Sequence, residues 1–272
     1  MEGRVIITGA TGAVGAAATR ALAAQGKFVV MACRNRQKAD AVRSAILADI
    51  PGADIGIRLL DLTSLASVRA FAEEIGSEPV AALFNNAGVI SRGYALTPDG
   101  LENTFSVNYF APFLLTQLLL PRLQPGARIV NMVSLTCCFV SVTERTLRPG
   151  PEDFSQLGTY ARAKTALLHA SLELARRYPE IRVNLADPGI VNSSMIDLGH
   201  WFDPLADLLF RPFCKSPEKG AKPALAALEA TSGPRYYVGG RSKPVPSRYR
   251  DSALDLRLWQ ETERILGGIL DQ

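Results

Sequence analysis

The stretch VIITGATGAVG, residues 5–15, indicates the fold that this chain adopts. Its first four residues are apolar or β-branched, which favours a buried strand, and an alanine-rich segment of helical composition, residues 16–24, follows the glycines. Glycines at such a turn let the backbone approach a pyrophosphate, and the helix that follows offers free N–H groups. The alternative is a turn whose glycines serve only the tight packing of strand against helix.

Short apolar runs recur along the chain at intervals that leave room for a helix between them. These runs are residues 28–32, 55–60, 81–84, 128–133 and 182–186. Parallel strands buried on both faces have this composition, and their crossover connections place helices on both faces of the sheet. We therefore predict an α/β fold: a single doubly wound, Rossmann-type domain over residues 1–272, with a parallel sheet flanked by helices on both faces.

The last third of the chain adds elements to this prediction. We expect a helix over residues 217–231, an edge strand over 235–238 and a C-terminal helix over 252–266. Two segments, 135–157 and 192–216, do not follow the pattern, because they are long, irregular and rich in Pro, Phe, Trp and Leu. Such segments in compact domains are often binding loops or lids.

Composition excludes several classes of function. The formal net charge is +4, and 30 Lys and Arg are interspersed with 26 Asp and Glu, so we expect no nucleic-acid partner. Four cysteines without C-x-x-C spacing and only two histidines are typical of a reduced protein without a metal site. The N-terminus lacks the layout of a signal peptide, and no apolar stretch approaches the roughly 20 residues that a bilayer requires. We expect a cytoplasmic protein with no membrane span.

The end of the second predicted strand, Ala32-Cys33-Arg34, indicates which dinucleotide the turn would bind. An acidic residue there would bind the ribose hydroxyls of NAD, whereas an arginine favours a 2′-phosphate. Because Arg34 stands at this position and Arg36 follows closely, we predict NADP(H) rather than NAD(H). The alternative is that Arg34 only opens a solvated turn.

The ends of the third and fourth predicted strands carry further polar residues. Asp61-Leu62 can place a carboxylate near the adenine amino group, although Asp61 could equally cap the helix that begins near Ser64. Asn85-Asn86-Ala87-Gly88 follows the fourth strand. Asn108 lies further along the chain, where a buried amide either bonds the backbone or holds a water molecule.

Tyr160 and Lys164 lie four residues apart in a segment of helical composition, so both project from one helix face. A free tyrosine has a pKa of about 10, and a nearby lysine ammonium favours the phenolate and brings that pKa toward neutrality. Tyr160 would then protonate a carbonyl oxygen as a hydride arrives. Because this spacing is common on solvated helices, the position of Ser134 matters: at the end of the fifth strand it could bond the substrate oxygen or cap a turn.

Taken together, these motifs resemble the short-chain dehydrogenase/reductase family over nearly the whole chain. The resemblance rests on Thr8-Gly9 with Gly12 and Gly15, Asn85 to Gly88, Asn108, Ser134, and Tyr160 with Lys164. Segments 32–34, 61–65, 99–102, 113–116 and 215–221, with Leu258-Trp259 and Glu263-Arg264, resemble the retinol-dehydrogenase-like branch. The resemblance implies a catalytic tetrad of Asn108, Ser134, Tyr160 and Lys164, in which Lys164 also bonds the nicotinamide ribose and Asn108 orders a proton-relay water.

The resemblance also extends the set of predicted cofactor contacts. Pro188-Gly189-Ile190-Val191 matches the segment beside the nicotinamide, and Ser193 falls where a threonine commonly bonds the carboxamide. The predicted dinucleotide contacts are Gly9, Thr11, Gly12, Ala13, Val14, Gly15, Arg34, Asp61, Leu62, Asn86, Ala87, Gly88, Tyr160, Lys164, Pro188, Gly189, Val191 and Ser193. The resemblance is also compatible with a homo-oligomer, because family members often pair through the helices that carry Asn108 and Tyr160.

Three positions depart from the family pattern. The glycine motif reads T-G-x-x-G-x-x-G, which is more usual in a longer, sugar-nucleotide branch of the family. Asp187 precedes Pro188 and could alter the charge near the nicotinamide. The usual Ser-Ser is Val133-Ser134, which leaves the catalytic hydroxyl in place.

The expected reaction is an NADP(H)-dependent interconversion of a carbonyl and an alcohol. Apolar residues in segment 192–216 predict a lid over a bulky hydrophobic substrate, such as a steroid-, retinoid- or aryl-ketone-like compound. The segment could instead pack on the core, on a neighbouring subunit or on a membrane surface. Two other functions remain open at this point: reduction of a C=C bond, as in protochlorophyllide reductases, and a non-catalytic dinucleotide-sensing protein.

Overall fold

A central sheet organises the chain in the computed structural model, which describes residues 3–191 and 214–270. Within these residues the sheet has eight strands, in the order β3-β2-β1-β4-β5-β6-β7-β8. Every neighbouring pair from β3 to β7 is parallel, and β8 is antiparallel to β7. The strands are Arg4–Thr8 (β1), Val29–Cys33 (β2), Ile55–Leu59 (β3), Val80–Asn85 (β4), Leu123–Met132 (β5), Arg182–Asp187 (β6), Tyr236–Val238 (β7) and Arg241–Lys243 (β8).

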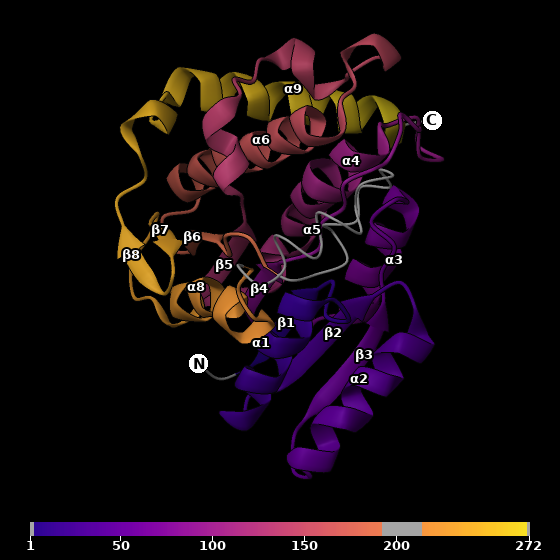
Figure 1. Cartoon of the computed structure of the whole chain (residues 1–272), viewed down its shortest axis with the longest axis vertical. Coiled ribbons are helices and arrows are strands. Elements are labelled where there is room, and N and C mark those ends of the chain that lie inside the picture. The colour runs from indigo at the N-terminus through magenta and orange to yellow at the C-terminus, as the bar shows by residue number, and fades with distance from the viewer. Residues whose placement is uncertain (1–2, 192–213, 271–272) are drawn as a thin grey trace.

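Helices cover both faces of this sheet (Figure 1). One face is covered by Ala13–Ala24 (α1), Arg36–Asp49 (α2) and Pro217–Glu229 (α8). The other is covered by Leu65–Ile75 (α3), Asn103–Phe105 (α4), Ala111–Leu119 (α5) and Gln156–Arg177 (α6), with Ser252–Leu270 (α9) packed outside α6. The predicted fold class, a doubly wound Rossmann-type α/β domain, is confirmed.

The strands are buried on both sides because their side chains alternate between two cores. In β1, Val5 and Ile7 pack with α1, α2 and α8, whereas Ile6 packs with the helices of the opposite face. This alternation explains why the strands are almost uninterrupted apolar runs in the sequence. The strand order reverses between β1 and β4, and ligands of open α/β sheets bind at such a reversal, beyond the carboxyl ends of the strands.

Helix α9 is fastened to the helix that carries Tyr160. Trp259, which is almost fully buried, packs edge-on against Phe113 of α5 at 4.6 Å between ring centroids, and the Arg177 guanidinium of α6 lies over its ring. His169 Nδ1 of α6 lies 2.5 Å from Asp255 Oδ1 of α9. The outer face of α5 and α6 is therefore covered by the chain's own C-terminal helix.

The structure differs from the sequence-based expectations in several elements. The short, polar strand β8 was not predicted, and the C-terminal helix reaches Leu270 instead of ending at 266. Segment 135–157 contains three short 3-10 turns, Leu135–Phe139, Glu144–Leu147 and Pro151–Asp153, before α6 begins at Gln156.

The predicted lid, residues 192–216, lies outside the described residues except for its last three positions. Ser216 is not part of a loop, because its hydroxyl caps the N-terminus of α8 by accepting from the Lys219 amide. The Lys215 amide donates to the Ile190 carbonyl at 2.9 Å. The two ends of the segment therefore meet beside β6.

Candidate active site

The glycine turn between β1 and α1 is closed by backbone contacts that admit no side chain. Gly9 has a φ of +64°, and a Cβ on Gly15 would lie 2.3 Å from the Gly9 carbonyl oxygen. Gly12 is the N-cap of α1 and has no side chain that could accept a hydrogen bond from the first turn of the helix. The N–H groups of that turn are therefore not capped by a side chain. Glycine is therefore required here for packing, and the same geometry leaves donors suited to a pyrophosphate.

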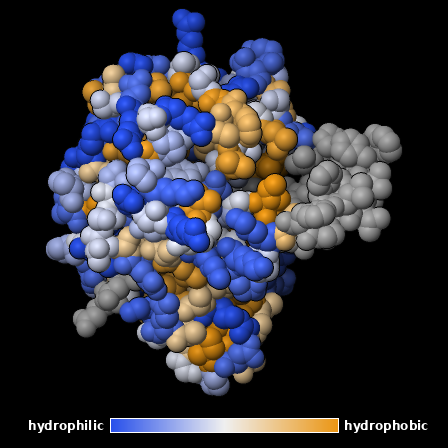
Figure 2. All heavy atoms as spheres, turned by 60° about the vertical axis from the view of Figure 1, so that its left-hand side comes forward, coloured by the Kyte–Doolittle hydropathy of each residue, from blue (hydrophilic) through white to orange (hydrophobic). Residues whose placement is uncertain are grey.

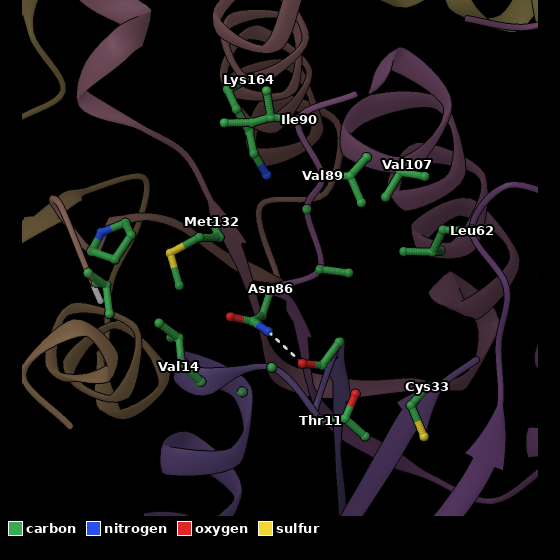
Figure 3. A pocket seen from close by; sticks show the side chains of 18 of the residues that line it. Thr11, Val14, Cys33, Leu62, Asn86, Val89, Ile90, Val107, Met132 and Lys164 are labelled. Atoms are coloured by element: carbon green, nitrogen blue, oxygen red, sulfur yellow. Dashed lines mark hydrogen bonds between the residues drawn. The ribbon is translucent and has the colours of Figure 1, made fainter. Parts of the chain in front are cut away.

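Thr8 and Asn86 hold this turn against the end of β4. The Thr8 hydroxyl accepts hydrogen bonds from the amides of Asn86 and Ala87, both at 3.0 Å. The Asn86 side-chain amide donates to the carbonyl oxygens of Thr8 at 2.9 Å and Gly9 at 3.3 Å. Figure 3 marks one hydrogen bond from this amide. Asn85 turns away and donates to Asn131 and Thr116 inside the protein. Of the two neighbouring asparagines, only Asn86 supports the turn.

A cavity of about 520 Å³ runs from the glycine turn to Tyr160 and Lys164. Its volume lies within the range of ordinary ligand and cofactor sites. Every predicted dinucleotide contact within the described residues lines it, and Ser193 lies outside those residues. The lining also includes residues that were not predicted: Ala32, Cys33, Leu60, Thr63, Val89, Ile90, Val107, Met132, Leu157 and Ile190. Most of these adjoin predicted positions in the chain, but nothing in the sequence pointed to Met132 or Leu157.

At the far end of the cavity, Arg34 lines the wall and is exposed to solvent, whereas Arg36 pairs with Asp40 at 3.1 Å. Asp61 also lines the cavity, and its carboxylate accepts from the Thr63 amide at 2.9 Å and the Thr63 hydroxyl at 2.8 Å. The suggestion that Asp61 caps α3 is wrong, because Ser64 is the N-cap and accepts from the Ser67 amide. Asp61 instead stabilises the preceding turn.

Tyr160 and Lys164 project from one face of α6, as their spacing predicts. Lys164 is 1% exposed, and its amine points into the cavity with Nζ 5.9 Å from the centroid of the Tyr160 ring (Figure 3). Burial lowers the pKa of Lys164 to about 8. Burial is also the main influence on Tyr160 and raises its pKa; a hydrogen bond from Ser134 lowers that pKa, and the charges of Cys137 and Asp187 add smaller increases. Desolvation of the phenol thus acts against the lowering of the Tyr160 pKa that its spacing to Lys164 predicts, and that lowering stays a prediction.

Ser134 has one of the two roles that its position suggests, because it caps a turn, and its bond to a substrate oxygen stays a prediction. Its oxygen accepts from the Thr136 amide at 3.2 Å and the Thr136 hydroxyl at 3.0 Å, which caps the turn Leu135–Phe139. These two bonds occupy both lone pairs of the Ser134 oxygen. Its own proton therefore remains for the oxygen of Tyr160 or of a substrate.

Asn108 bonds the backbone. It lies in a π-helical turn, Ser106–Phe110, and its side-chain amide donates to the carbonyls of Thr104 at 2.7 Å and Val89 at 2.8 Å. A Cβ on Gly88 would lie 2.8 Å from Asn108 Oδ1 and 3.4 Å from Lys164 Nζ, so these two groups are neighbours. The relay water implied by the family resemblance stays a prediction.

Replacement of Gly15 tests the fit of the turn to a dinucleotide. We expect Gly15→Ala to weaken NADPH binding by about tenfold or more, because the added methyl must displace the Gly9 carbonyl that shapes the turn. Titration of NADPH fluorescence measures this. Gly52→Ala is the matched control, because no atom lies within 4 Å of its added Cβ. Equal affinity in the two variants would separate the turn from dinucleotide binding.

Neither a membrane-spanning helix nor a metal site is found in the described part of the chain. No helix there is long and apolar enough to span a bilayer. No group of three or more His, Cys, Asp or Glu side chains in the same residues could hold a metal ion. The groups available for chemistry are the phenol of Tyr160 and the amine of Lys164, which line one end of the cavity, and the Ser134 hydroxyl, which bonds the phenol.

Comparisons with known proteins agree with this geometry. The family model for short chain dehydrogenases matches residues 4–198. Retinol dehydrogenase 12 of Mus musculus is 36% identical over 97% of this chain and 86% of its own length, and polyprenol dehydrogenase of Mus musculus is 35% identical over 97% and 84%. A crystal structure of a protein from Mycobacterium paratuberculosis, 30% identical, superposes with a TM-score of 0.79 over 97% of this chain and 93% of its own.

Similar folds have been solved with either dinucleotide. A metagenomic short-chain oxidoreductase in complex with NADP has a TM-score of 0.61 and 25% identity over 87% of this chain and 95% of its own. A Burkholderia phymatum protein in complex with NAD has a TM-score of 0.69 and 20% identity over 88% and 89%.

Proposed function

Because the chain belongs to the short-chain dehydrogenase/reductase family, in its retinol-dehydrogenase-like branch, we propose that it interconverts a hydrophobic carbonyl compound and its alcohol with NADP(H). One observation carries the proposal. Tyr160, hydrogen-bonded to Ser134, lies beside the buried Lys164 at one end of the cavity whose other end is the glycine turn.

The residues present fit a dinucleotide. The turn Gly9 to Gly15 and the start of α1 would hold the pyrophosphate, Arg34 the 2′-phosphate, and Pro188 to Val191 the nicotinamide end. The bound nicotinamide would supply or accept the hydride. The fit rests on Gly9 and Gly15, where any Cβ would close the turn.

The chain's own groups handle the proton. Because the pKa of Tyr160 is raised, the phenol is protonated at neutral pH and can donate to a carbonyl oxygen. Ser134 can donate a hydrogen bond to the same oxygen with the proton that Thr136 leaves available. Lys164 lies beside Tyr160, where a protonated amine would stabilise the phenolate that forms.

Apolar residues around the reactive end support a bulky hydrophobic substrate. Leu157 and Ile190 line the cavity, yet both are exposed, and Phe139, close behind Ser134 in the chain, is 77% exposed. Figure 2 shows hydrophobic side chains exposed in patches among polar ones on one side of the molecule. Two of the relatives are named for retinol and polyprenol, both hydrophobic alcohols.

A substrate screen with NADPH oxidation as readout tests the proposal. We expect turnover of steroid-, retinoid- or aryl-ketone-like carbonyls, with the alcohol as product. Comparable rates on small polar sugars would overturn the substrate class. A saturated product formed from an unsaturated ketone would indicate C=C reduction, and NADPH binding without any turnover would indicate a sensing protein.

Replacement of Arg34 tests the cofactor preference. We expect Arg34→Ala to weaken NADPH binding by about 10- to 100-fold and NADH binding little, because the guanidinium would lose a charged hydrogen bond to the 2′-phosphate. Dissociation constants for both nucleotides measure this. Arg36→Ala is the control, since Arg36 already pairs with Asp40. An equal loss for both nucleotides would make Arg34 a surface residue without a role in this choice.

A further inference from the structure

A second cavity, of about 460 Å³, lies at the β8 edge of the sheet and shares no lining residue with the first. Arg235, which lines it, immediately precedes β7, and Pro244 follows β8, whose last residue pairs with the first residue of β7. Both therefore lie at the amino end of β7. The dinucleotide cavity lies beyond the carboxyl ends of the parallel strands, so the second cavity is separate from the proposed active site.

The second cavity combines apolar and cationic walls. Leu172 of α6 and Val245, each 5% exposed, supply apolar surface together with the rings of Pro234 and Pro244. The charged lining residues are Arg176, Arg235 and Arg250. No Asp or Glu within the described residues lines this cavity. Three guanidiniums thus face a space that offers them no carboxylate of its own.

Two of these guanidiniums are held by neutral partners. Arg235 Nε donates to the Ser242 hydroxyl at 2.8 Å, and Arg250 Nε donates to the Val245 carbonyl at 2.9 Å. Neither arginine forms an ion pair with any residue of 3–191 or 214–270. Because each is anchored through Nε, its two terminal nitrogens remain available to a ligand.

The third guanidinium is already paired. Arg176 contacts Asp255 Oδ2 of α9 at 2.6 Å and Glu173 Oε2 of its own helix at 2.8 Å. These carboxylates fix the arginine in place and compensate its charge. The uncompensated charge of the cavity therefore belongs to Arg235 and Arg250.

The chain around the cavity has the same sign of charge. Residues 234–250 contain five lysines and arginines and no Asp or Glu, whereas the formal net charge of the whole chain is only +4. Asp251 comes next, and its carboxylate caps α9 by accepting from the Leu254 amide at 2.9 Å. Ser252, the first residue of α9, lines the cavity, so the positive end of the helix dipole lies there too. Such a concentration of positive charge attracts anions.

We propose that this cavity binds an organic phosphate, with Arg235 and Arg250 bonding the phosphate oxygens and Leu172 and Val245 contacting the organic part. A guanidinium presents pairs of N–H donors that match phosphate oxygens. A phosphate monoester carries a charge of about −1.5 to −2 at neutral pH, which balances two uncompensated arginines better than one carboxylate would. The cavity has the volume of a small-molecule site and leaves room for more than the phosphate group.

Phenyl phosphate, a soluble monoester with an apolar ring, is the first probe. The full chain is titrated with it in about 0.15 M NaCl, and binding is followed by phosphorus NMR. The test variant carries Arg235→Gln and Arg250→Gln, which keep most of each side chain and an amide donor. We expect saturable binding to the unmodified chain and an affinity about tenfold or more weaker in the test variant, because two charged hydrogen-bond donors are lost.

The matched control carries Arg241→Gln and Lys243→Gln. It removes the same charge from the neighbouring strand β8, at two exposed residues that line neither cavity. This variant should bind phenyl phosphate as the unmodified chain does. An equal loss in both variants would overturn the proposal, and so would the absence of saturable binding to the unmodified chain. If the double replacement lowers the urea midpoint of unfolding, Arg250→Gln alone, at an exposed position, should still weaken binding several-fold.

Vesicles distinguish a lipid headgroup from a free organic phosphate. The chain is sedimented with phosphatidylcholine vesicles that contain or lack phosphatidic acid, whose headgroup is a phosphate monoester. Sedimentation that requires phosphatidic acid, and that is lost in the test variant but kept in the control, would assign a lipid as the source. Binding of phenyl phosphate without sedimentation would assign a free compound. If neither probe binds, the cavity is not a phosphate site and the proposal is overturned.

Discussion

Tyr160→Phe is expected to lower carbonyl reduction by about 10²- to 10⁴-fold while leaving NADPH affinity unchanged, which is the usual contribution of a general acid. The substitution removes the hydroxyl that bonds Ser134 and would donate the proton, and it removes almost no volume from a side chain that is partly exposed in the cavity. Lys164 and the cavity wall keep their positions, so the dinucleotide should still bind. Steady-state turnover and NADPH titration on the same preparation measure both quantities.

Tyr178→Phe is the control for this experiment, because Tyr178 ends the same helix far from the cavity. Turnover in that variant should match the unmodified chain. A loss of similar size in both variants would point to a disturbed helix, and full turnover in Tyr160→Phe would remove Tyr160 from the mechanism.

Lys164→Met is expected to abolish most turnover and at the same time to stabilise the fold by about 3 kcal/mol at neutral pH. Burial lowers the pKa of Lys164 from 10.5 to about 8, which means that the folded protein holds this proton less tightly than the unfolded chain does. The cost of the buried charge is full below pH 8 and disappears as pH rises toward 10.5. Methionine has a similar volume and no charge, so it avoids this cost.

Chemical denaturation near neutral pH and again above pH 8 measures the change in the free energy of unfolding. The advantage of Lys164→Met over the unmodified chain should shrink as pH rises through this interval. Lys219→Met, at an exposed position on α8, is the control and should change stability little. A Lys164→Met variant that is less stable at every pH would show that Lys164 supports the fold by contacts other than its charge.

Local patterns in the sequence were sufficient to predict seven of the eight described strands and most of the residues that line the cavity. β1 and the glycine turn are contiguous in the chain, and Tyr160 and Lys164 share a helix face by spacing alone. Strand β8 was not predicted because Arg241–Lys243 is polar and exposed, so its only signal is the pairing with β7.

Features that depend on packing between distant segments could not be read from the sequence. Asp187 accepts a hydrogen bond from the Tyr236 hydroxyl, which lies 49 residues further along the chain on β7, and β7 neighbours β6 only in the folded sheet. The direction of the Tyr160 pKa depends on how completely the phenol is buried, and spacing to Lys164 says nothing about burial. The backbone carbonyls that Asn108 bonds could not be predicted, because they depend on the π-helical turn in which it lies.

Helix α9 has a consequence for how this protein supports its catalytic helix. Trp259 and Asp255 contact α5 and α6, so α9 braces the helix that carries Tyr160 from within the same polypeptide. The brace is intramolecular, so it is present in every folded molecule however dilute the protein becomes.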